Sequence, residues 1–382
     1  MLLSLCLGLF LADGIVSLVD DSLTVCFGLR VLMPVRGMVL FCATVMAVLV
    51  YGLMALTPMI PKRLFVPVAL FNPVAALVMV PVLIYAYGRH PQAAWLISAG
   101  QVVLGLSLLG KFRGGLKPGW PLVREEQLEL KRFSWLNLTG FVLVNVFVLL
   151  PAVAGYLFVC ASLAVGHFSE GFLALRPGGL TVQVRTYVRN DGKKIQLAPM
   201  AHVGEAQFYR KLSRSFPTNS IILMEGVSDS RNLLTNKLSY RRVATSLGLT
   251  EQQKEFEPSR GEQVAADVDV EEFGTNTIAL LNLVGLIYSK GLNAETVLKL
   301  VSYSPTPEVE VEVLEDVLHK RSQHVVGEIR DRLTGPEMLI VPWGVAHMPE
   351  IAREVRGLGF RLEESGEYQV VRFGPGRNRP KP

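Results

Sequence analysis

The sequence predicts an N-terminal multi-span α-helical membrane region followed by an α/β domain with a mixed sheet, flanking helices and a helical insertion. The chain is 50% hydrophobic, and its apolar excess lies before about residue 167. Several runs there approach the ~20 apolar residues that a helix needs to cross a bilayer. Beyond that point charged residues become common and the apolar runs shorten to the lengths of strands and surface helices. We therefore divide the 382 residues into a membrane region (1–166), a linker (167–179), an α/β domain (180–373) and a disordered tail (374–382).

The membrane region is expected to hold four to five transmembrane helices. Segment 1–19 has no basic residue ahead of its apolar run, which favours a spanning or interfacial helix over a signal peptide. The other expected spans are 37–56, 66–87, 93–110 and 139–165. We find in the spans no paired charged residues of the kind that mark an ion path, so anchoring is the expected role and transport the weaker hypothesis. Their main polar or helix-bending residues are Asn72, Pro73, Pro81, Gln101 and Asn145.

Basic residues between the last two spans predict the orientation. They are Lys111, Arg113, Lys117, Arg124, Lys131 and Arg132. The positive-inside rule places this loop in the cytoplasm, so the α/β domain is expected outside the cytoplasm. The protein is then expected in a bacterial inner or cell membrane. The alternative is that this loop is a cytoplasmic amphipathic helix whose charge does not control topology.

Charge and cysteine content exclude several classes of function. The net charge is only +5, and no dense basic stripe with interleaved aromatic residues is present, so no nucleic-acid partner is expected. All four cysteines precede residue 161, without CxxC or zinc spacing, which excludes a disulfide scaffold or thiol catalysis in the α/β domain. No feature of the sequence indicates an oligomeric state.

The α/β domain is expected to begin with a hairpin and a crossover unit. Alternating segments Thr181–Arg189 and Lys193–Met200 flank Asn190-Asp191-Gly192, and Asp-Gly between such runs predicts a hairpin. A helix over 205–216 and a buried strand over Ser220–Met224 follow. Strand, helix and strand in this order predict parallel strands, so His202 and Glu225 should lie at the same edge of the sheet.

The rest of the domain is expected to be a helical insertion and a return to the sheet. Residues 232–333 are predicted to be mainly helical, including 237–247, 277–288 and a long charged helix over 308–333. The sheet is expected to resume at Met338–Val341, with a helix after His347 and a last strand over Tyr368–Phe373.

Two histidines follow predicted strands and form the candidate site. His202 and His347 each come a few residues after an apolar strand, and ligands of open α/β sheets gather at the carboxyl ends of strands. Two histidines and a carboxylate are the minimum set for a catalytic divalent metal with an open position. His202, His347 and Glu225 match that set, although no short-range metal motif such as HExxH is present.

Other polar residues near these positions have plainer interpretations. Glu205 and Glu350 come three residues after their histidines, where a carboxylate caps a helix, and we favour capping over a ligand role. The acidic run of Asp267, Asp269, Glu271 and Glu272 is typical of a solvated helix start, with a cation site as the alternative. From their pattern alone, Arg321 and His324 indicate a solvated helix face.

Four motifs resemble the TraB/PrgY/GumN family, which includes the Tiki metalloproteases and is related in fold to erythromycin-esterase and ChaN-like proteins. They are Ala198-Pro-Met-Ala-His202, Ile222-Leu-Met-Glu-Gly226, the run over 240–253 and Gly344-Val-Ala-His347. The resemblance covers about residues 180–373 and implies a site made of His202, Glu225 and His347. It also implies a late arginine, best matched by Arg321. Pro199 stands where the family's first motif has Gly, and it removes a backbone N–H.

The sequence therefore predicts a membrane-anchored metal-dependent hydrolase of the peptidase kind, acting on an extracytoplasmic peptide or acyl substrate. In this hypothesis His202, His347 and Glu225 bind a divalent metal, or the histidines act as general acid and base without one. Glu225 orients water and Arg321 stabilises an oxyanion. The alternative is a non-catalytic module of the TraB/PrgY type that binds a peptide signal.

Overall fold

The computed structural model describes residues 1–113, 115, 119–124, 126, 128, 133–235, 239–291, 293–303, 305–335 and 338–374. The predicted disordered tail, apart from Gly374, lies outside these residues. The chain forms two compact units, Met1–Cys160 and Ala161–Pro382, which we call unit 1 and unit 2.

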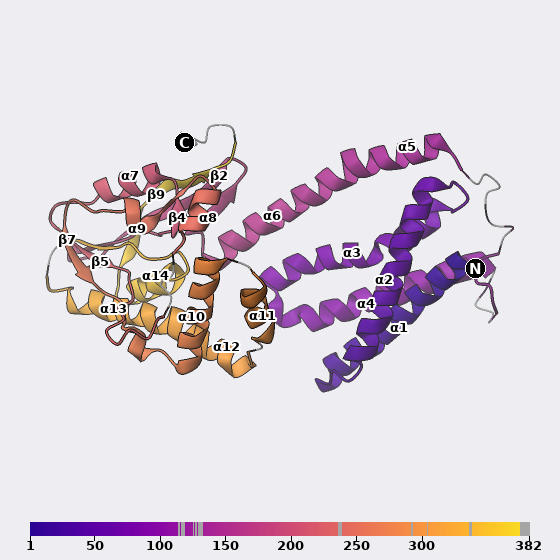
Figure 1. Cartoon of the computed structure of the whole chain (residues 1–382), viewed down its shortest axis with the longest axis horizontal. Helices are drawn as coiled ribbons and strands as arrows, with labels where there is room; N and C mark the ends of the chain where they lie inside the picture. Colours follow the sequence, from indigo (N-terminus) through magenta and orange to yellow (C-terminus); the bar gives the residue numbers. More distant parts are fainter. Residues whose placement is uncertain are drawn as a thin grey trace. The chain divides into compact units, whose positions relative to one another are not determined.

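Unit 1 consists of long apolar helices (Figure 1). They are α1 (Leu2–Phe27), α2 (Met33–Leu56), α3 (Lys62–Tyr85), α4 (His90–Arg113) and α5 (Trp135–Val144), with the 3-10 turn η1 (Tyr87–Arg89) before α4. The π-helical segment η3 (Asn145–Leu149) joins α5 to α6 (Leu150–Phe168), and the boundary between the units falls inside α6. By length and composition, five helical stretches can cross a membrane, which agrees with the predicted membrane region.

Charged residues that lie just outside the first two predicted spans form an ion-paired cluster between α1 and α2. Asp13, Asp20 and Asp21 are all buried on α1. Arg36 of α2 forms ion pairs with Asp20 and Asp21. The sequence interpretation ended the first apolar run at residue 19. Helix α1 continues to Phe27, and these carboxylates lie on its buried face.

Unit 2 is built on a seven-stranded mixed sheet, which confirms the predicted α/β class. The strands pair in the order β1-β2-β3-β8-β5-β7, and β9 pairs with β2. Their bounds are β1 (Leu173–Arg176), β2 (Gly179–Val188), β3 (Lys194–Leu197), β5 (Ser220–Met224), β7 (Glu262–Ala265), β8 (Met338–Val341) and β9 (Arg361–Arg372). Strands β3, β8, β5 and β7 are parallel, whereas β1, β2, β3 and β9 form antiparallel pairs with one another through β2.

Several predicted elements appear where the sequence placed them. Strands β2 and β3 form the hairpin around Asp191-Gly192, and β8 lies between β3 and β5. Strand β9 begins at Arg361, well before the predicted start at Tyr368, and two other segments differ. Residues of the predicted linker form β1, and the predicted helical insertion contains β7, whose Glu262 and Gln263 are exposed. An edge strand of this composition has neither an apolar run nor alternation, so its pattern does not indicate a strand.

The remaining elements of unit 2 are helices and two short strands. They are β4 (Val203–Gly204), α7 (Ala206–Arg214), α8 (Arg241–Ser246), β6 (Thr250–Glu251), α9 (Gln252–Glu255), η4 (Val270–Glu272), α10 (Thr275–Lys290), α11 (Ala294–Ser302), α12 (Pro307–Leu314), the π-helical η5 (Glu315–Lys320), α13 (Arg321–Asp331) and α14 (Met348–Gly357). Strands β4 and β6 pair with each other in a separate two-stranded sheet.

Helices cover both faces of the main sheet. Phe208, Leu212 and Phe216, in and after α7, pack against one face together with Ile222 and Ile340. Residues of α13 and α14 pack against the other face, which presents Ile195, Leu223 and Leu339 among others. In Figure 1, α7 lies above the strands and α13 and α14 lie below them. The layers leave the ends of the parallel strands as the place where polar side chains can meet.

The start of β2 requires a glycine. Gly179 has a φ of 145°, and a Cβ there would collide with the carbonyl oxygen of Val371 in β9. We expect Gly179→Ala to destabilise unit 2 by about 1–3 kcal/mol. The neighbouring Gly178→Ala is the matched control, because its Cβ position is open, and it should change stability little. Hydrogen exchange of β2 and β9 in the full-length protein measures the difference, and equal protection in the two variants would contradict it.

Candidate functional site

The candidate site lies at the carboxyl ends of the four parallel strands. Glu225 directly follows β5, and Asp267 comes two residues after β7. His202 and His347 follow β3 and β8 by five and six residues, respectively. Because parallel strands end at the same edge of a sheet, this topology collects residues that are far apart in the sequence.

Arg321 is the centre of the site. Its Nη2 donates to Glu225 Oε1 at 2.9 Å and to Asp267 Oδ2 at 2.6 Å, and its Nε donates to Asp267 Oδ1 at 3.0 Å. The side chains of these three residues are 12%, 8% and 0% exposed. Burial alone would lower the pKa of Arg321, but hydrogen bonds and charges of Asp267 and Glu225 raise it. The interpretation of Arg321 as part of a solvated face is therefore wrong.

Backbone groups complete the coordination of both carboxylates. The N–H of Gly344 donates to Glu225 Oε2 at 2.6 Å, and the N–H of Gly226 donates to Asp267 Oδ2 at 3.0 Å. Two carboxylates face one guanidinium, so these three groups carry one excess negative charge. Buried ion pairs persist only where such additional hydrogen bonds satisfy the charged groups.

His347 is buried beside this cluster and is neutral at pH 7. Its Nδ1 lies 3.0 Å from Ser322 Oγ, and its Nε2 lies 3.4 Å from Arg321 Nη1 and 3.8 Å from Glu225 Oε1. Burial, followed by the charge of Arg321, lowers the pKa of His347 to about 4. The π-helical segment η5 ends immediately before Arg321 and Ser322, which are the two residues of α13 that contact the ring.

His202 lies at the margin of the site. Its exposed ring stacks on Tyr240, with the ring centroids 4.8 Å apart. Tyr240 in turn packs edge-on against Tyr288 of α10. Burial, then the charges of Tyr288 and Glu225, raises the pKa of Tyr240. The structure thus brings Glu225, Arg321 and His347 into contact, and it places His202 in an aromatic stack beside them.

The present arrangement does not fit the predicted divalent metal. Among the described residues, no group of three or more His, Cys, Asp or Glu side chains is placed to hold a metal ion. Both oxygens of Glu225 already accept hydrogen bonds, and the guanidinium of Arg321 lies where a cation would approach this carboxylate. The metal stays a prediction, and we derive the chemistry of the site without it.

Three other sequence interpretations have clear outcomes. Glu205 is the N-cap residue of α7, but its side chain accepts the backbone N–H of Arg372 and makes no cap bond. Glu350 lies in the first turn of α14 and binds His319 Nδ1 at 3.0 Å. Asp269 does cap a helix, η4, through a capping box with Glu272. Capping thus explains part of the acidic run and fails for Asp267, which belongs to the site.

Pro199 leaves the sheet intact. The neighbouring N–H groups of Ala198 and Met200 donate to the carbonyl oxygens of Val341 and Trp343, at 3.0 and 2.8 Å. In a parallel ladder, the backbone N–H groups of alternate residues point to the same neighbouring strand. The N–H that Pro199 lacks would point away from the segment Val341–Trp343, so this pairing loses no hydrogen bond.

Sequence reasoning missed Ser322 and Trp343, and it favoured a solvated helix start over a binding role for Asp267. Trp343 is fully buried, donates its Nε1–H to the carbonyl oxygen of Leu223 at 2.9 Å and packs edge-on against His347. The signal for Trp343 was its place in the turn after β8, two residues before the Val-Ala-His sequence. For Asp267 and Ser322 the sequence pattern held no comparable signal.

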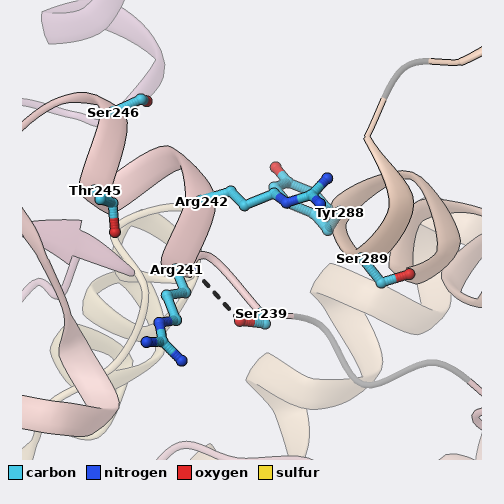
Figure 2. A pocket seen from close by; sticks show the side chains of 7 residues that line it. All are labelled: Ser239, Arg241, Arg242, Thr245, Ser246, Tyr288 and Ser289. Carbon is cyan, nitrogen blue, oxygen red and sulfur yellow. Dashed lines mark hydrogen bonds between the residues drawn. The ribbon is translucent and has the colours of Figure 1, made fainter.

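A pocket of about 580 Å³ lies beside the aromatic stack. Its lining residues are Ser239, Arg241, Arg242, Thr245, Ser246, Tyr288 and Ser289. Figure 2 shows Arg242 reaching from α8 towards Tyr288 of α10. Neither Arg241 nor Arg242 forms an ion pair with a residue that the structure describes. Two unpaired guanidinium groups among hydroxyl groups favour an anionic ligand.

Comparisons of the chain with protein-family models, curated proteins and solved structures find no match. The resemblance to the TraB/PrgY/GumN family therefore stays a prediction, and the function has to be argued from the site itself.

The buried neutral His347 makes stability depend on pH. Its pKa is about 4 in the folded chain and ordinarily about 6.5 when unfolded, so between these values the unfolded chain binds more protons. We expect the unfolding temperature of unit 2 to fall as the pH falls from about 6.5 to about 4. His347→Gln removes the titrating group and should flatten this part of the curve. An identical pH dependence of the unfolding temperature in the variant would contradict the assignment.

Proposed function

We propose that unit 2 hydrolyses a peptide or related acyl substrate at the edge formed by β3, β8, β5 and β7, with its own side chains as acid and base. The observation that carries the proposal is the pair of His347 Nε2 and Glu225 Oε1, 3.8 Å apart with Arg321 beside both. This separation is too long for a direct hydrogen bond and suits a bridging water.

The proposed reaction begins with this water. His347 is unprotonated at pH 7, so its Nε2 lone pair takes a proton as the water oxygen attacks the substrate's carbonyl carbon. The excess negative charge of Glu225 and Asp267 stabilises the imidazolium that forms. The carbonyl oxygen becomes an oxyanion, and the bond to the leaving group then breaks.

Arg321 and His202 complete the reaction. The Nε and Nη2 hydrogens of Arg321 bind the carboxylates and one Nη1 hydrogen lies towards His347 Nε2, so the second Nη1 hydrogen is left to face the oxyanion. His202 is exposed, exchanges protons with solvent and gives a proton to the leaving group. The product acid is released, and His347 returns its proton to solvent.

The pocket lined by Arg241 and Arg242 supports a substrate that carries an anionic group. Stacked His202 and Tyr240 connect the site to Tyr288, which lines the pocket. We propose that an anionic group of the substrate, such as a carboxylate, binds there while the scissile carbonyl lies at Arg321. The basic loop between the last two spans supports an extracytoplasmic location for this substrate.

The test is cleavage of a panel of quenched fluorescent peptides, with and without terminal carboxylates, by full-length protein in detergent. We expect cleavage that survives a metal chelator and favours the peptides that carry the carboxylate. Activity that a chelator abolishes and a divalent metal restores would overturn the metal-free reaction and return the site to the predicted metallohydrolase. Stoichiometric binding of intact peptide without cleavage would overturn hydrolysis and favour the peptide-binding module.

A further inference from the structure

The last turn of α6 leads directly into a group of arginines in unit 2. The stretch Trp135–Phe168 is long and apolar enough to cross a membrane, and Glu170 is the first charged residue after it. The backbone turns there, with φ values of 47° at Glu170 and 76° at Gly171. Residues that directly follow a spanning helix lie at the level of the lipid headgroups.

Three arginines meet at Glu170. Nη2 of Arg353 and Nη2 of Arg356, both on α14, lie 3.5 and 3.4 Å from its Oε1 and Oε2, respectively. Arg185 of β2 donates from Nη2 to the backbone carbonyl oxygen of Glu170 at 2.8 Å. A strand and a helix that are far apart in the sequence thus bring three guanidinium groups to one residue, two positions beyond the end of α6.

The position of Arg185 is fixed by its surroundings. Its Cζ lies 3.9 Å from the centre of the ring of Phe172, which is fully buried. Gly171 makes room for it, since a Cβ at that position would lie 3.1 Å from Arg185 Nη2. Within the described part of the chain, Nε and Nη1 of Arg185 have no hydrogen-bond partner. These N–H groups are therefore available to a ligand.

Positive charge exceeds negative charge in this cluster. The three arginines supply three positive charges and Glu170 one negative charge, so the four residues carry a net charge of +2. No other carboxylate of a described residue forms an ion pair with these arginines. The side chains of Arg353 and Arg356 are 66% and 50% exposed, and their distances to Glu170 are long for charged hydrogen bonds. Both guanidinium groups can therefore bind a further anion.

We propose that Arg185, Arg353 and Arg356 bind the phosphate group of an anionic phospholipid in the membrane that α6 crosses. Guanidinium groups bind phosphate oxygens through paired N–H donors, and arginines beside a span are attracted to anionic headgroups. A place two residues beyond a span favours a lipid over a soluble phosphate, because the headgroups lie at this level. Phe168, the last residue of α6, is 67% exposed and suits the boundary between headgroups and acyl chains.

The test is hydrogen exchange of the full-length protein in a non-ionic detergent, titrated with phosphatidylglycerol or with phosphatidylcholine. We expect saturable protection of residues 168–172 and of α14 by phosphatidylglycerol, and none by phosphatidylcholine. Arg353→Gln combined with Arg356→Gln removes two charges, each of which contributes about fivefold to the attraction. This double variant should weaken the affinity for phosphatidylglycerol by about thirtyfold.

Arg210→Gln combined with Arg214→Gln is the matched control. It also removes two exposed positive charges, but from α7, which covers the other face of the sheet. We expect an unchanged affinity for phosphatidylglycerol in this variant. An equal loss of affinity in the two double variants would overturn the proposal, because it would show that only the net charge of the chain matters.

Glu170→Gln separates lipid binding from a purely structural role. It removes the carboxylate that competes for the arginines, so the affinity for phosphatidylglycerol should rise by about fivefold. If the arginines serve only to hold the turn at Glu170, this variant should instead lose protection there, which would overturn the proposal. Inorganic phosphate that gives the same protection without lipid would also overturn it, because the cluster would then be a site for a soluble anion. None of these outcomes depends on the proposed hydrolysis.

Discussion

Replacing Arg321 by Met should destabilise unit 2 by about 3–5 kcal/mol, because it leaves Glu225 and Asp267 buried without a counter-charge. Methionine keeps an unbranched apolar side chain but removes the guanidinium, whose Cζ lies 5.5 Å from the centre of the Trp343 ring. The loss therefore reports the charge and its hydrogen bonds.

Arg330→Met is the matched control on the same helix. Arg330 pairs with Glu354 at 2.8 Å, but both side chains are about half exposed. Such exposed pairs contribute about 0–1 kcal/mol. Hydrogen exchange of β5, β7 and β8 in the full-length proteins measures both variants. Equal losses in the two variants would mean that the Arg321 cluster contributes no more than an exposed pair.

Much of the sheet that holds the site was predictable from local pattern. The Asp-Gly hairpin and the apolar strands before Glu225 and His347 have periodicities and turn residues that depend on few distant contacts. The expectation that His202 and Glu225 share one edge follows from the order strand, helix, strand, and the structure confirms it.

Asp267 and Arg321 could not be found in the same way. Asp267 follows an edge strand of polar composition and begins an acidic run, so its local pattern is that of a solvated loop. Arg321 starts a helix whose charged residues indicate exposure, and the guanidinium becomes buried only because α13 packs across the strand ends. The resemblance suggested Arg321, but nothing local indicated that Arg321 and Asp267 bind each other. Long-range ion pairs of this kind depend on tertiary packing, which residue periodicity does not encode.

Unit 1 shows the same limit of sequence patterns. Summed hydropathy identified its helices correctly, because length and apolar content decide whether a helix can span a bilayer. A summed hydropathy does not reveal single polar residues within an apolar helix. Asp13 sits in a helix of high mean hydropathy, and only its contacts with Gln101 and Asn72 distinguish a buried polar group from a span end.

If the proposed reaction is correct, His347→Gln should lower kcat by about 10²–10⁴-fold, the range that a general base contributes. Glutamine keeps a hydrogen-bonding group near Ser322 and Arg321 but has no basic nitrogen. KM should change little, since the pocket of Arg241 and Arg242 holds the substrate elsewhere. In the wild type, the acid limb of kcat/KM should lie near pH 4 rather than 6.5, because His347 Nε2 stays unprotonated above its lowered pKa.

His319→Gln is the control for this experiment. His319 also binds a residue of α14, Glu350, but its side chain is 41% exposed. Within the described part of the chain, neither Arg321 nor Glu225 is a hydrogen-bond or ion-pair partner of His319. We expect nearly wild-type kcat in this variant. A loss below tenfold in His347→Gln would remove His347 from the chemistry, and an acid limb well above pH 4 would assign the base to another group. The two readouts separate a catalytic base from a buried histidine that only shapes the site, because a structural role would not move the pH profile.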